Sequence, residues 1–144
     1  MKSDFIDNPH NSGNAGHMTT DNKTLIQRAL AELISTGDAD TLVPLLKDDF
    51  VYHRPDATTR TKAEWLALVR EGPLDEMKVE IDHVLAEGDH VVMHSRRRIP
   101  GAGPGVEVVD IWRFDDGRIA EAWEIVEPAA ETAAHQVWWE SDGR

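Results

Sequence analysis

The sequence contains no cysteine, which excludes disulfide bonds and thiolate metal ligands. Basic residues are also scarce: 15 Lys and Arg stand against 27 Asp and Glu, a formal net charge of −12. A surface that binds nucleic acid or an anionic membrane needs clustered positive charge, so we expect neither partner. No apolar run is long enough to span a bilayer, and no hydrophobic signal segment opens the chain. These absences favour a cytoplasmic protein.

The sequence also lacks the motifs of a serine nucleophile and of a phosphate-binding loop. No Gly-x-Ser-x-Gly elbow occurs. The glycine-rich stretch 101–105 contains Pro104 and precedes a strand-like run rather than a helix, which argues against a phosphate loop. Three histidines and an aspartate fall on separate strand-like runs, so a metal site would have to be assembled from distant strands. We therefore predict no metal and no cofactor.

Length and pattern indicate one folded domain with two flanking segments. Residues 1–21 are polar, rich in Asn and Gly and without an apolar period, which is typical of a disordered leader, and their Gly-His-Met resembles a cloning junction. Residues 22–128 carry the periodic apolar pattern of the domain. In the tail, 129–144, the large rings of Trp138 and Trp139 are expected to pack on this domain or on a second subunit.

Three helices are expected in the first half of the domain. Apolar residues recur at helical spacing from 23 to 34, and Gly37 ends that pattern. A second, short helix follows Asp38. Thr61 and Glu64 have the spacing of a capping box, which begins a third helix that stops at Gly72.

The second half of the chain switches to a period of two, which predicts strands. One face of the first long strand is expected to carry Met77, Val79, Ile81, His83 and Leu85. Asp115-Asp116-Gly117 separates two further strand-like runs and predicts a hairpin turn. Helices followed by a meander of antiparallel strands predict an α+β fold with the helices on one side of a curled sheet.

A carboxylate interrupts the apolar stripe of the strand before this hairpin. Side chains two apart share a face, which places Asp110 among Val108, Trp112 and Phe114. A buried, ionised carboxylate without a partner costs several kcal/mol, so it raises its pKa or acquires a hydrogen-bond donor. Asp110 therefore needs a structural partner or a chemical role.

Histidines are the expected partners of this carboxylate. His53 and His94 fall in strand-like runs with apolar neighbours, and an imidazole beside a carboxylate in a dry pocket is equipped for proton transfer near neutral pH. We predict Asp110, His94 and His53 as catalytic residues. The candidates for contact with the substrate are Tyr52, Trp65, His83, Trp112 and Trp123, for which ordinary core or rim packing is the alternative.

The segment from Asp110 to Pro128, DIWRFDDGRIAEAWEIVEP, resembles the C-terminal hairpin of the SnoaL-like polyketide cyclases, within the superfamily of ketosteroid isomerase and nuclear transport factor two. Further similar features are Gly-Asp-Ala-Asp after the first helix and the run FVYHRP. The resemblance implies a cone-shaped, strongly curved antiparallel sheet packed against three N-terminal helices and enclosing a pocket. It also implies a homodimer and an active-site role for Asp110.

Two departures from the resemblance bear on the chemistry. Arg54 stands where ketosteroid isomerase keeps its catalytic base, which disfavours a steroid isomerase. Ala122 stands where many SnoaL-like proteins have a histidine, which disfavours classical cyclisation. The leading hypothesis is cofactor-free acid–base chemistry on an apolar carbonyl compound, giving cyclisation, isomerisation or dehydration. The alternatives are an epoxide or ester hydrolase, favoured by a second carboxylate beside Asp110, and a module that binds a small ligand or a protein without catalysis.

Overall fold

The structure, a computed structural model, describes residues 14–128 of the 144-residue chain. Its helices are α1 (Asn14–Thr36), the 3-10 helix η2 (Ala39–Leu45) and α2 (Lys62–Glu71), and its strands are β1 (Leu46–His53), β2 (Thr59–Thr61), β3 (Lys78–Glu87), β4 (His90–Arg98), β5 (Val106–Asp115) and β6 (Arg118–Pro128). No helix in this part of the chain is long and apolar enough to cross a membrane. Trp138 and Trp139 lie outside the described residues.

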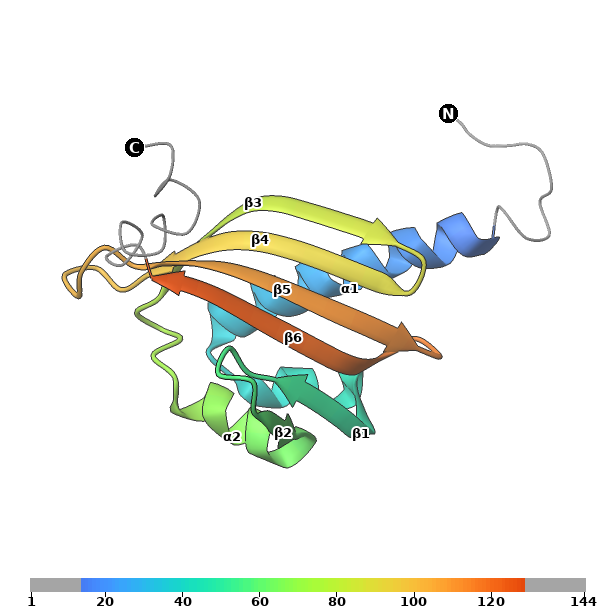
Figure 1. Cartoon of the computed structure of the whole chain (residues 1–144), viewed down its shortest axis with the longest axis horizontal. Helices are drawn as coiled ribbons and strands as arrows, with labels where there is room; N and C mark the ends of the chain where they lie inside the picture. Colours follow the sequence, from blue (N-terminus) through green and yellow to red (C-terminus); the bar gives the residue numbers. More distant parts are fainter. Residues whose placement is uncertain (1–13, 129–144) are drawn as a thin grey trace, which may run out of the picture.

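The strands form one curved sheet in the order β2-β1-β6-β5-β4-β3, and the helices lie on one side of it (Figure 1). This arrangement confirms the predicted α+β fold. The pairing of β1 with β6 is parallel, whereas every other strand pair described is antiparallel. The meander expected from the sequence did not include this pairing. A long connection separates β1 from β6, so no hairpin turn dictates their relative direction.

Local signals for helix ends and turns are confirmed. The hydroxyl of Thr61 accepts from the amide of Glu64 at 3.2 Å, and the Glu64 carboxylate accepts from the amide of Thr61 at 2.9 Å, which completes the capping box. In the β5–β6 hairpin, Asp116 and Gly117 both have positive φ, +55° and +79°. Two such residues form the turn that matches the twist of paired strands.

The helices bury the concave face of the sheet. Ile26, Ala29 and Leu33 of α1 pack with buried residues of the strands, which include Phe50, Tyr52, Val91, Phe114, Ile119 and Ala122. α1 begins at Asn14, inside the stretch expected to be a disordered leader, so the helix is longer than its apolar pattern indicated.

The prediction that Met77, Val79, Ile81, His83 and Leu85 share one face is wrong beyond residue 81. Ile81 pairs with Ser95 but His83 pairs with His94, so one extra residue, Asp82, interrupts the ladder. Such a bulge reverses the faces that follow it. Leu85 is consequently 64% exposed on the outer face, while Val84 and Ala86 pack against the core.

Candidate active site

Asp110 lies on the concave face of the sheet, at the centre of β5. Its neighbours on this face are Val108, Trp112 and Phe114, as the alternation predicted, and the residue is only 8% exposed. The register places Met93 of β4 and Glu124 of β6 directly opposite it. The second of these neighbours is another carboxylate, which the sequence analysis did not anticipate at this position.

Arg97 of β4 connects the two carboxylates. Its Nη2 donates to Oδ2 of Asp110, and its Nη1 donates to Oε2 of Glu124 at 3.3 Å. The hydroxyl of Tyr52, on β1, donates to Oε1 of Glu124 at 2.6 Å. Four side chains from four strands thus form one hydrogen-bonded chain, Asp110–Arg97–Glu124–Tyr52, which we call the carboxylate–arginine network.

Two members of the network, Asp110 and Tyr52, have raised pKa values. Burial raises the pKa of Asp110 to about 7; the charge of Arg97 opposes this rise, and the charge of Glu124 adds to it. Burial and the bond to Glu124 also raise the pKa of Tyr52, which keeps its hydroxyl protonated as a donor. Asp110 can therefore gain or lose a proton near neutral pH, as a general acid or base requires.

A cavity of about 360 Å³ opens between the helices and the concave face and ends at this network. Its walls are mainly apolar and include Ile26, Leu30, Leu33, Trp65, Val69 and Trp112. Tyr52, Arg54, Arg97, Asp110 and Glu124 supply the polar part of the lining. An apolar hollow with a few converging polar groups is the usual form of a small-molecule site. Tyr52, Trp65 and Trp112 line it, as the sequence analysis expected.

The predicted histidines do not reach this cavity. Met93 faces Asp110 on the concave side, so the next residue, His94, points to the outer face. Tyr52 is buried against the core, and His53 after it likewise points outward. His83 is exposed beside His94. The expectation of an imidazole beside Asp110 is corrected: among the described residues, the structure brings Arg97 and Glu124 to that carboxyl instead.

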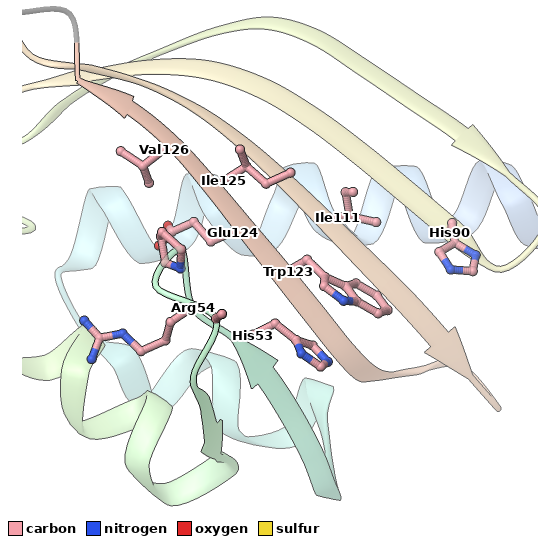
Figure 2. Close-up of a pocket in the computed structure, with 10 residues that line it drawn as sticks. His53, Arg54, His90, Ile111, Trp123, Glu124, Ile125 and Val126 are labelled. Atoms are coloured by element: carbon pink, nitrogen blue, oxygen red, sulfur yellow. The ribbon is translucent and has the colours of Figure 1, made fainter. Parts of the chain in front are cut away.

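The outer face carries a hollow of its own, of about 520 Å³ (Figure 2). Its lining includes His53, His90, Ile111 and Trp123. The rings of His53 and Trp123 stack with centroids 5.0 Å apart. Trp123, expected in the wall of the Asp110 cavity, therefore lies on the opposite side of the sheet.

Sequence reasoning missed Arg97 and Glu124. Arg97 stands within the basic run Arg96-Arg97-Arg98 but shares the buried parity of Val91, Met93 and Ser95. Glu124 likewise shares the parity of Ala120 and Ala122 on β6. A charged residue at the buried parity of a strand was the signal available in both cases.

Three solved structures illustrate the proteins to which this chain is similar in fold. IdmH of Streptomyces antibioticus, proposed to be a polyketide cyclase, is 23% identical, with 80% of this chain and 97% of that chain covered and a TM-score of 0.60. A proposed ketosteroid isomerase from Kribbella flavida is 17% identical, with 77% and 81% covered and a TM-score of 0.67. An LEH-like epoxide hydrolase from M. tuberculosis is 23% identical, with 76% and 84% covered and a TM-score of 0.61.

These similarities establish the fold that the sequence resemblance implied, a cone-shaped sheet packed against helices. No curated protein matches the sequence. The sequence model of the SnoaL-like domain family matches residues 26–122, which make up most of the described residues. The protein therefore belongs to the SnoaL-like domain family.

Proposed function

We propose that this protein is a cofactor-free enzyme that performs acid–base chemistry on a small, mainly apolar molecule. One observation carries the proposal: Asp110, with a pKa of about 7, shares Arg97 with a second carboxylate at the polar end of an apolar cavity. Paired titratable groups in different environments are the usual basis of acid and base assignments. Asp110 serves as the acid and Glu124 as the base.

Hydrolytic opening of an epoxide is the reaction that this pair favours. Asp110 gives its proton to the epoxide oxygen as a carbon–oxygen bond breaks. Glu124 takes a proton from a water molecule whose oxygen forms the new bond to carbon, and the product is a diol. Proton exchange with solvent then returns both carboxyl groups to their starting states. A second carboxylate beside Asp110 supports this reaction over the others, and an LEH-like epoxide hydrolase shares the fold.

Enolisation of an apolar carbonyl compound is the second candidate. Glu124 would remove the proton next to the carbonyl group while protonated Asp110 donates a hydrogen bond to the enolate oxygen. Such a step leads to cyclisation, isomerisation or dehydration. The shared fold of IdmH and of the Kribbella flavida protein supports it.

Matched substrates distinguish the two reactions. The protein is incubated with small apolar epoxides in ¹⁸O-labelled water and, separately, with ketones of similar size in deuterated water. Epoxide hydrolysis places one ¹⁸O in a diol, whereas enolisation exchanges a ketone's α-hydrogens in deuterated water. Asp110→Asn should lower the active reaction by about 10²- to 10⁴-fold. Asp116→Asn, the same change in the exposed hairpin turn, should leave it unaltered.

Absence of both reactions contradicts the enzymatic proposal. If a small apolar ligand then binds equally well to the wild type and to Asp110→Asn, the cavity belongs to a binding module.

We also propose that two copies associate through the outer face of the sheet. Three apolar side chains of this face are exposed, Val51 at 36%, Leu85 at 64% and Ile125 at 55%, and Ile125 lies beside Trp123 and Ile111 in Figure 2. Large exposed apolar residues on one surface favour association. Light scattering after size exclusion should give the mass of a dimer, and Ile125→Glu should shift it toward a monomer. A wild-type monomer at high concentration would contradict this assembly.

A further inference from the structure

Three ligand-type side chains meet on the outer face of the sheet. Asp82 of β3, His94 of β4 and Glu107 of β5 each offer one nitrogen or oxygen atom, and these atoms lie within 4.8 Å of one another. The strands that carry them are neighbours in the sheet. The sequence analysis predicted no metal because the candidate ligands lie on strands that are separate in the sequence. Pairing of β3, β4 and β5 in the sheet brings three such side chains together.

The bulge in β3 determines which side chains reach this cluster. Ile81 pairs with Ser95 and His83 with His94, so Asp82 is the extra residue between them. In a regular strand Asp82 and His83 would face opposite sides of the sheet. Because of the bulge, Asp82 contributes to the cluster while His83 contacts His94 on the same outer face. Bulges often redirect side chains in this way beside functional sites.

Distances within the cluster are close to those between ligands of one ion. Nε2 of His94 lies 2.7 Å from Oε1 of Glu107. Two donors bound at about 2.1 Å to one zinc ion are about 3 to 4 Å apart. Small side-chain rotations therefore suffice to bring all three donors onto one ion. The side chains of Asp82, His94 and Glu107 are 20%, 33% and 40% exposed, which leaves room for water as a further ligand.

His83 is placed to orient the metal-binding imidazole. Its Nδ1 lies 3.1 Å from Nδ1 of His94, and the two rings stack. When Nε2 of His94 binds a metal, the ring proton resides on Nδ1 and is donated to His83. Metal-bound histidines usually donate their second ring N–H to a carboxylate, a backbone carbonyl or water; here the acceptor is the imidazole of His83.

A cation already occupies part of this position. Nε of Arg96 lies 3.2 Å from Oδ2 of Asp82 and 3.2 Å from Oε2 of Glu107. The Arg96 side chain is 59% exposed, so it can move into solvent at small cost. A divalent ion would replace it with greater charge and with direct coordination.

We infer that Asp82, His94 and Glu107 form a binding site for a divalent transition-metal ion of the zinc type. Imidazole nitrogen and carboxylate oxygen are donors that such ions accept. The site lies on the face opposite the Asp110 cavity, the face through which two copies are proposed to associate, and is independent of the proposed reaction. A bound ion links β3, β4 and β5, and its binding stabilises the folded state by an amount that grows with the logarithm of its concentration over Kd.

Calorimetric titration of the full chain with zinc chloride tests this assignment. The wild type should bind one ion at this site, and His94→Ala and Glu107→Gln should each weaken that binding at least tenfold. Arg96→Gln should tighten it, because the competing cation is gone. His90→Ala is the matched control: this imidazole also contacts a carboxylate, Asp89, at 2.7 Å, but lies outside the cluster.

A thermal unfolding series provides the second readout. Zinc should raise the melting temperature of the wild type and of His90→Ala, and should have no such effect on His94→Ala. Because every variant retains His10 and His17, binding at those residues would appear equally in all of them. Failure of the wild type to bind zinc overturns the assignment. Equal affinity in the wild type, His94→Ala and Glu107→Gln also overturns it.

Discussion

Asp110 and Glu124 stand directly opposite each other on β5 and β6. Two carboxylates in this arrangement repel each other and destabilise a sheet. Arg97, which donates to both, offsets part of that repulsion. Burial is the main cause of the raised pKa of Asp110, and the charge of the facing Glu124 adds to it. The pairing thus places a carboxyl group with a raised pKa beside a second carboxylate in one cavity.

Stability should fall as the pH rises from about 4 to about 7. The pKa of Asp110 is about 7 in the folded protein and about 3.9 in an unfolded chain, so the folded state binds more protons across this window. The favourable contribution is complete below about pH 4 and lost above about pH 7. Asp110→Asn cannot ionise and should lack this decline, which corresponds to a few kcal/mol.

Urea unfolding at several pH values measures this effect. The difference between the wild type and Asp110→Asn isolates the contribution of one carboxyl group from all others that titrate. Asp116→Asn should retain the wild-type dependence. Parallel curves for the wild type and Asp110→Asn would show that Asp110 is not protonated in the folded state near neutral pH.

Removal of Arg97 should destabilise the protein and raise the pKa of Asp110 further. Arg97→Gln leaves two facing carboxylates without their shared cation, and loss of one partner from a buried ion pair typically costs about 3–5 kcal/mol. Carbon-13 NMR of the Asp110 carboxyl group should report the pKa, and urea unfolding the stability. Arg96→Gln, on the exposed outer face, should alter stability by no more than about 0.5 kcal/mol. An unchanged Asp110 pKa in Arg97→Gln would refute the coupling.

Loss of the Tyr52 hydroxyl should lower kcat more than it alters KM. This hydroxyl holds Oε1 of Glu124 at 2.6 Å, so Tyr52→Phe leaves the proposed base less well oriented while the apolar ring remains in the cavity wall. Stability should fall by about 1 kcal/mol for the lost hydrogen bond. Steady-state kinetics with the substrate found by the epoxide and ketone assays separate the two constants. A kcat equal to that of the wild type would remove Tyr52 from the mechanism.

Gly105 should tolerate no side chain. Its φ is +88°, and a Cβ there would lie 2.6 Å from the carbonyl oxygen of Arg97 and 2.9 Å from Cβ of Arg98. Gly105→Ala should therefore destabilise by about 1–3 kcal/mol and disturb the backbone that carries Arg97. Gly103→Ala is the control, since its φ is also positive, +109°, but nothing lies within 4 Å of the added carbon. Equal melting temperatures for the two variants would contradict the clash.

Local features of the chain could be predicted because they depend on residues close in sequence. The Thr61 and Glu64 capping box, the Asp116-Gly117 turn and the place of Asp110 in an apolar stripe are set by spacing and by side-chain alternation within one strand. The fold class and family followed from the order of such elements and from the resemblance of one hairpin. These inferences required no knowledge of which strands pair.

The partners of Asp110 depended on pairing and register, which alternation along one strand does not specify. Arg97 lies across from Val106 and reaches along the sheet to Asp110, while His94, one strand position from Met93, faces the other side. The bulge at Asp82 shifts β3 by one residue and so creates the outer-face cluster. The raised pKa is likewise a tertiary property, because burial by the helices and the opposed Glu124 produce it. Sequence alone therefore determined that a carboxylate occupies the apolar stripe, and the register of the folded sheet decided which groups lie beside it.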